Sequence, residues 1–197
     1  GELRLGLLMP EMAEGRTRYR KALEALSGDL ERLLESNRTD VVSRALGLLS
    51  RLGASRAEGA ARRMISSDSP AVRAAAVRVI GGVVSEGDLD MIRQAMDDSS
   101  FEVRRAACSA LAAAARDGAL GAPARQRVVS MLSERLQDEY ASVRLSAVRA
   151  LGTIGGSRAA GVLASKLDSF STELKLEALA ALAGMEVERA RRVVEEY

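Results

Sequence analysis

Side chains able to perform catalysis are scarce in this sequence of 197 residues. It contains no histidine and a single cysteine. The absence of histidine removes Ser-His-Asp and Cys-His nucleophiles and the usual ligand of most zinc sites. One cysteine can form neither an internal disulfide nor a thiolate cluster, and it fits reducing surroundings. The composition therefore argues against an enzyme and against a bound metal or other cofactor.

Two other patterns could in principle bind or modify a ligand. Residues 155–161 are rich in glycine, but they lack the lysine and the preceding strand of a phosphate-binding loop. We interpret them as a connector between helices. Cys108 lies on the flank of an apolar helix face, which indicates a buried core residue rather than a reactive thiol.

The chain is a repeat array, and Val72 can serve as the anchor of one unit. Equivalent anchors follow at intervals of 31, 31, 40 and 31 residues, starting from Val41. The aligned columns share their residue type. The anchors are Val41, Val72, Val103, Val143 and Leu174; four residues later stand Ala45, Ala76, Ala107, Ala147 and Ala178; eight later stand Leu49, Ile80, Leu111, Leu151 and Leu182. A fixed period of this size indicates a solenoid.

Each unit is predicted to be a helical hairpin. Apolar residues at the anchor and at 4, 8 and 11 residues beyond it form one face of an α-helix, which we call the B helix. A shorter apolar stripe upstream predicts an A helix, and a polar turn joins the two. Ser69 before Pro70 fits the N-cap and first position of a B helix. Such hairpins bury their apolar sides only by stacking, so the sequence predicts an all-α solenoid of about five hairpins.

The dipeptide after each polar turn resembles that of the HEAT-repeat family, particularly its short bacterial and archaeal branch seen in phycobilisome lyase-type proteins. Val72-Arg73, Val103-Arg104 and Val143-Arg144 carry the signature, Leu174-Lys175 is a variant, and Val41-Val42 lacks the basic residue. The resemblance extends from about Asp29 to Met185. It implies an α-solenoid, or superhelix, in a prokaryotic protein.

The repeats divide the chain into three parts. We expect an N-terminal tether and capping helix at 1–28, and a C-terminal capping helix at 186–197. Between them, at 29–185, lie the repeats 29–53, 54–86, 87–117, 118–156 and 157–185. The third interval, of 40 residues, is long because of an insertion near 117–122, where two glycines and no apolar period predict a mobile loop.

The resemblance assigns two sets of residues. Turn carboxylates would pair with the basic residue after the anchor of the adjoining unit, forming a structural ladder of Arg73, Arg104, Arg144, Lys175, Asp98 and Asp138. The B helices would line a concave surface, which gives candidate partner-binding residues Arg78, Arg105, Arg149, Leu145 and Leu176. Small residues on the same face, among them Ala74, Gly81 and Ala112, would leave room for the partner. An ordinary solvated face is the alternative.

The function expected is a non-catalytic scaffold or adaptor that binds a protein partner through this concave face, alone or as a module of a larger protein. The alternative is a nucleic-acid-binding HEAT module using the concave arginines. A HEAT-like DNA glycosylase has less support, since the concave columns contain neither aromatic residues nor acids. A phycobilin-lyase-like subunit is supported only by the repeat. No apolar run approaches the ~20 residues of a membrane span, and we expect a cytoplasmic location.

Overall fold

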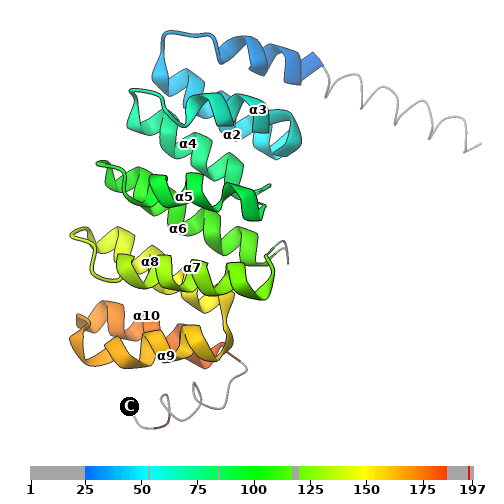
Figure 1. Cartoon of the computed structure of the whole chain (residues 1–197). Coiled ribbons are helices and arrows are strands. Elements are labelled where there is room, and N and C mark those ends of the chain that lie inside the picture. The colour runs from blue at the N-terminus through cyan, green and yellow to red at the C-terminus, as the bar shows by residue number, and fades with distance from the viewer. Residues whose placement is uncertain (1–24, 53, 84, 117–119, 186–194, 196–197) are drawn as a thin grey trace, which may run out of the picture.

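The computed structural model describes residues 25–52, 54–83, 85–116, 120–185 and 195. Within these ranges the chain forms five helical hairpins stacked in chain order (Figure 1), so the predicted all-α solenoid is confirmed. The hairpins pair a helix at 25–33 with α2 (Thr39–Leu52), α3 (Ala54–Met64) with α4 (Pro70–Gly81), α5 (Leu89–Met96) with α6 (Phe101–Arg116), α7 (Ala122–Arg135) with α8 (Ala141–Ile154), and α9 (Gly156–Lys166) with α10 (Thr172–Ala183). None of the helices in these ranges has the length and apolar character needed to cross a membrane.

Every B helix begins two residues before its anchor, because the polar turn ends there in each unit. Pro70 supplies the preset backbone angle at the start of α4. Ser69 occupies the N-cap position as expected, but its side chain makes no capping hydrogen bond. Its backbone N–H instead donates to the Ser67 hydroxyl at 3.3 Å. The turn, rather than a side-chain cap, therefore defines this helix start.

The core follows the predicted columns. The residues four and eight beyond each anchor are almost fully buried in all five units, Ala76 and Ile80 among them. The first unit deviates at its anchor, since Val42 is buried there while Val41 is only partly so. Without a basic residue after the anchor, α2 is free to turn the second valine inward.

The hairpins form two layers. The B helices α2, α4, α6, α8 and α10 contact one another along the whole stack, whereas the A helices α3, α5, α7 and α9 touch one another much less. Helices of the A layer lie in front of the B layer in the view of Figure 1. The B helices therefore form the more closely packed layer of the stack.

The first A helix differs from its expected start at Asp29. The chain is already helical at residue 25 and continues through Gly28 to residue 33. A glycine inside a helix costs only about 1 kcal/mol relative to alanine, which packing can offset. Ser27 is buried on this helix. The rest of the expected N-terminal segment, and the expected cap at 186–197 apart from residue 195, lie outside the described residues.

The insertion after α6 makes more contacts with the rest of the protein than its composition predicted. Leu120 is 4% exposed. The Gly121 N–H donates to the Glu86 carboxylate at 3.0 Å, and the Arg125 guanidinium donates to the carbonyls of Ala115 and Leu120. The expectation of a loose segment is therefore wrong for its second half, because a buried leucine and side-chain hydrogen bonds fasten it. Residues 117–119 lie outside the described ranges.

Candidate functional site

The surface of the B layer carries the residues expected to bind a partner. Arg78 on α4, Arg105 on α6 and Arg149 on α8 are exposed. Leu145 on α8 is partly buried against the core, and Leu176 on α10 is 62% exposed. We call this set of five residues the B face. Its charged part lies over α4, α6 and α8, and its apolar part lies over α8 and α10.

The three arginines of the B face differ in their pairing. The Arg149 guanidinium donates to the Glu177 carboxylate of α10 at 2.8 Å. This neutralises one of the positive charges that the sequence suggested would be available. Among the residues that the structure describes, Arg78 and Arg105 form no ion pair with an acidic side chain. Partial loss of hydration next to the packed B helices and the neighbouring positive charge of Arg105 lower the pKa of Arg78, although its side chain reaches solvent.

Three of the small residues expected to leave room on this face are instead buried against neighbouring helices. Ala74, Gly81 and Ala112 are buried. A Cβ on Gly81 would lie 2.6 Å from the Cα and Cβ of Ala110. A Cβ on Gly152 would lie 2.9 Å from the Cβ of Ala181 in the same way. At these positions the small side chains therefore allow neighbouring B helices to approach closely and leave no open space.

The arginine after the anchor bridges two adjacent units in the middle of the stack. Arg73 on α4 makes a two-pronged contact with Asp98, with both N–O distances 2.8 Å. Arg104 on α6 contacts Asp138 in the same way, at 2.8 and 2.9 Å. In each case Nη1 of the arginine also donates to two carbonyls of its own turn. One guanidinium thus fixes its own turn and the turn of the next unit.

Because these bridges are largely buried, each partner depends on the other to compensate its charge. The side chains of Arg104 and Asp138 are 8% and 2% exposed. Burial alone would raise the pKa of Asp138, but hydrogen bonds from Arg104 and from the Tyr140 N–H lower it below its ordinary value. The hydrogen bonds from Arg73 likewise lower the pKa of Asp98. Both carboxylates are therefore charged at neutral pH and require their arginines.

The last two members of the expected ladder are arranged differently. Nη1 of Arg144 donates to the carbonyls of Asp138 and Glu139 in its own turn, at 2.7 and 3.0 Å. No carboxylate of the described residues accepts a hydrogen bond from it, because the position equivalent to Asp98 and Asp138 is Ser169. Lys175 on α10 lies 4.0 Å from Asp168, which belongs to the turn of the same hairpin. The two-pronged bridge is therefore not repeated between α8 and α10.

Several interactions were not anticipated from the sequence. Phe101 and Tyr140 stack with ring centroids 4.7 Å apart, and the Arg104 guanidinium lies 5.5 Å from the Tyr140 ring centre. Arg62 on α3 binds the buried Asp88 at 2.6 Å. The sequence could have indicated the contact between Arg62 and Asp88, because the two residues are 26 positions apart, which is about one repeat. Both contacts join neighbouring units.

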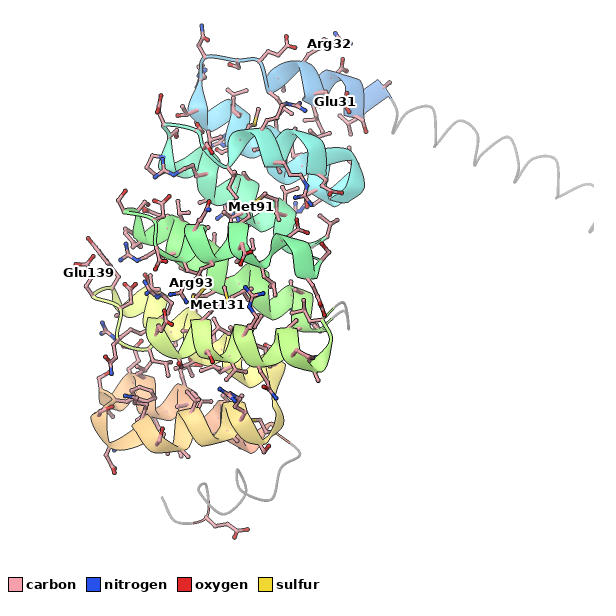
Figure 2. The ribbon with its side chains drawn as sticks, viewed as in Figure 1. Glu31, Arg32, Met91, Arg93, Met131 and Glu139 are labelled. Carbon is pink, nitrogen blue, oxygen red and sulfur yellow. The ribbon has the colours of Figure 1, made fainter. Side chains whose placement is uncertain are left out.

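The A layer has a hollow of about 580 Å³, lined by Arg93, Pro123, Gln126, Arg127, Ser130, Met131 and Arg158. Arg93 and Met131 lie close together on its wall in Figure 2. Arg93 is bound to Glu134 and Arg127 to Asp90, both at 2.8 Å. Arg158 reaches only the Ser130 hydroxyl, at 3.4 Å. Acidic neighbours thus neutralise most of the positive charge around this hollow.

The described residues contain no group of three or more carboxylate, cysteine or histidine side chains placed to hold a metal ion. Cys108 is fully buried, and burial raises its pKa to about 12. A thiol with that pKa is almost entirely protonated at neutral pH, so it is a poor nucleophile. Its role in this structure is packing within α6.

The stacked hairpins and their arginine–aspartate bridges define the class of protein, an α-solenoid built from helical repeats. Family comparison places it more narrowly. Residues 27–112 match the family described as HEAT repeats, and residues 101–154 match the family described as HEAT-like repeat. Residues 27–154 of the chain thus belong to the HEAT-repeat family. No curated protein matches the sequence significantly.

Solved structures share the fold at low sequence identity. The complex of CpcE and CpcF of phycocyanin lyase from Nostoc sp. PCC7120 contains a chain 22% identical, with a TM-score of 0.64 over 80% of this chain and 98% of that one. A designed armadillo repeat protein in complex with the peptide (KR)4 is 22% identical, with a TM-score of 0.57 over 85% and 86%. An engineered protein is 20% identical, with a TM-score of 0.59 over 86% and 84%. At these identities the likeness concerns the fold.

Proposed function

We propose that this chain is a non-catalytic scaffold or adaptor that binds a protein partner through the B face. The exposed Leu176 is the observation that carries the proposal. A leucine 62% exposed on an inner helix contributes little to the core and gains from being covered. Leu145 holds the equivalent position on α8, so the two leucines form an apolar spot across adjacent helices.

The chemistry around this spot suits a protein interface. Interfaces combine apolar anchors with arginine, and they contain little lysine. Only 3 of the 29 basic residues of the chain are lysine, and the basic residues of the B face are all arginine. Two of the similar structures are of complexes, one between two proteins and one with a peptide. We further propose that the partner is cytoplasmic. The chain would bind it either on its own or as a module of a larger protein.

Affinity capture from the native lysate tests it. A Leu145→Glu/Leu176→Glu variant should lose the captured protein, while a control altered on the A layer, Gln126→Glu, should retain it. Treatment with nuclease should leave capture unchanged. Loss in the A-layer control together with retention in the B-face variant would contradict the proposal.

Nucleic acid is the second candidate, favoured by Arg78 and Arg105. Their positive charges are close enough for one to lower the pKa of the other, and neither is paired with an acid in the described residues. A fluorescent oligonucleotide titrated at two salt concentrations tests this candidate. Because phosphate contacts release counterions, binding through these arginines should weaken steeply with salt. Sub-micromolar, salt-sensitive binding that Arg78→Gln/Arg105→Gln abolishes would favour nucleic acid over protein.

A further inference from the structure

The interface between α8 and α10 lacks a carboxylate that the two preceding interfaces possess. Between α4 and α6, Asp98 accepts two hydrogen bonds from Arg73, and between α6 and α8, Asp138 accepts two from Arg104. Arg144 makes the same contacts with its own turn as those two arginines. Its Nε and Nη2, the atoms that bind the carboxylate in the other units, donate to no described residue. Ser169 occupies the place of the aspartate, and its hydroxyl donates to the Lys166 carbonyl at 2.7 Å.

A hollow of about 240 Å³ lies beside this arginine. Its lining comes from the first turns of α8 and α10 and comprises Ala141, Ser142, Arg144, Leu145, Ser171, Glu173 and Leu174. The hollow therefore offers a guanidinium and an apolar wall within one small space. It is continuous with the B face through Leu145.

We infer that Arg144 binds an aspartate or glutamate side chain of the protein partner, which takes the place of the missing ladder carboxylate, while an apolar neighbour of that residue packs on Leu145. The inference rests on the proposed function and narrows it to a partner segment that combines an acid with an apolar residue. Planar two-pronged recognition of a carboxylate is the contact for which a guanidinium is best suited. The bridges at Asp98 and Asp138 show this contact twice in the same fold.

Glu173 is the opposing charge in the hollow. It forms no ion pair within the described part of the chain, and it would repel an incoming carboxylate. The site should therefore be selective for an acid that reaches Arg144 directly rather than for anions in general. Removing the charge of Glu173 should strengthen binding.

A defined peptide tests the inference with the purified protein. The probe is the capped pentapeptide Ala-Leu-Asp-Leu-Ala, and the matched control has Asn in place of Asp. The readout is the Nε–H resonance of Arg144 together with the Leu145 methyl resonances in NMR titrations. The Asp peptide should shift both saturably, and the Asn peptide should bind about tenfold more weakly, since a charged acceptor strengthens the hydrogen bonds.

Variants of the chain complete the test. Ser169→Asp should supply the missing carboxylate internally, raise the melting temperature and weaken the peptide about tenfold, whereas Ser169→Asn should do neither. Glu173→Gln should tighten binding and Arg144→Gln should abolish it, whereas Arg63→Gln, at an exposed arginine of α3 outside the B face, should leave it unchanged. Equal affinity for the Asp and Asn peptides, or unchanged affinity in Ser169→Asp, would overturn the inference. If that happens while the B-face variant still loses its partner in lysate capture, the proposed function stands and only the acid-binding site fails.

Discussion

At the scale of single residues, the contact between Arg104 and Asp138 is the most buried ion pair between adjacent hairpins in the described part of the chain. Both side chains are removed from water, and each has hydrogen-bond partners for its charge. A buried pair of this kind adds little compared with an apolar pair, but loss of one partner leaves a buried charge uncompensated. The ladder therefore makes the register of stacking specific.

Asp138→Ala should lower the free energy of unfolding by about 3–5 kcal/mol, because it leaves the Arg104 guanidinium buried and unpaired. The measurement is urea denaturation followed by circular dichroism. The matched control is Asp90→Ala, which removes an ion pair with Arg127 whose side chains are 83% and 59% exposed. An exposed pair of that kind contributes between 0 and about 1 kcal/mol. Equal losses of unfolding free energy in the two variants would show that the buried bridge contributes no more to stability than the exposed ion pair.

Asp88 should make the stability depend on pH in the acid range. The hydrogen bond from Arg62 lowers the pKa of Asp88 from 3.8 to about 2. A group whose folded-state pKa is lowered stabilises the fold above its unfolded pKa, and that contribution is lost as pH falls from about 4 to about 2. The contribution at neutral pH is about 2 kcal/mol.

Comparison with Asp88→Asn measures this contribution. The difference in the free energy of unfolding between the two proteins should shrink as pH falls through that window. A constant difference from pH 6 to pH 2 would mean that the carboxylate has the same pKa in the folded and unfolded chains.

At the scale of elements, the spacing of the B helices depends on small residues where neighbouring helices cross. Gly81 faces the backbone of Ala110. Such a contact brings helices to the short end of the usual interaxial range of about 8–10 Å.

Gly81→Ala should destabilise the protein by about 1–3 kcal/mol, because the added methyl would overlap the Ala110 backbone. Gly47→Ala in α2 is the matched control, because nothing lies within 4 Å of the added Cβ. There the higher helix propensity of alanine should stabilise the protein by about 0.5–1 kcal/mol. Thermal melting of both variants checks the prediction, and the same sign of change in both would contradict it.

At the scale of the whole molecule, the stability of each hairpin is expected to depend on its neighbours, since each hairpin buries its apolar side only on the adjacent ones. Leu111 lies in the central unit and is fully buried. The exposed Leu176 is instead available at the surface of the last described hairpin.

Leu111→Ala should therefore cost about 2–5 kcal/mol in denaturant unfolding. Leu176→Ala should cost less than about 0.5 kcal/mol, because the exposed leucine side chain makes few contacts that the substitution could remove. Native-state hydrogen exchange should show the loss of protection in Leu111→Ala spreading from α6 to α4 and α8. A loss confined to α6 would argue against coupling between the hairpins.

The sequence by itself determined the repeat, the helical hairpins and the core columns. Val72, Ala76 and Ile80 lie on one helix face because the helical period places them there, whatever surrounds the helix. Recurrence of the same types at Val103, Ala107 and Leu111 then requires the same packing in the next unit. Local periodicity was therefore enough to predict an all-α solenoid and its register.

Only the tertiary structure decided which surface residues are available. Gly81 was expected on an open face and lies against Ala110, and Arg149 was expected to be free and is bound to Glu177. Contacts of this kind depend on the offset and rotation between adjacent hairpins, which the pattern within one unit does not encode. Arg144 matches Arg73 and Arg104 in sequence, yet only stacking on the next unit determines that Ser169, and no carboxylate, stands opposite it.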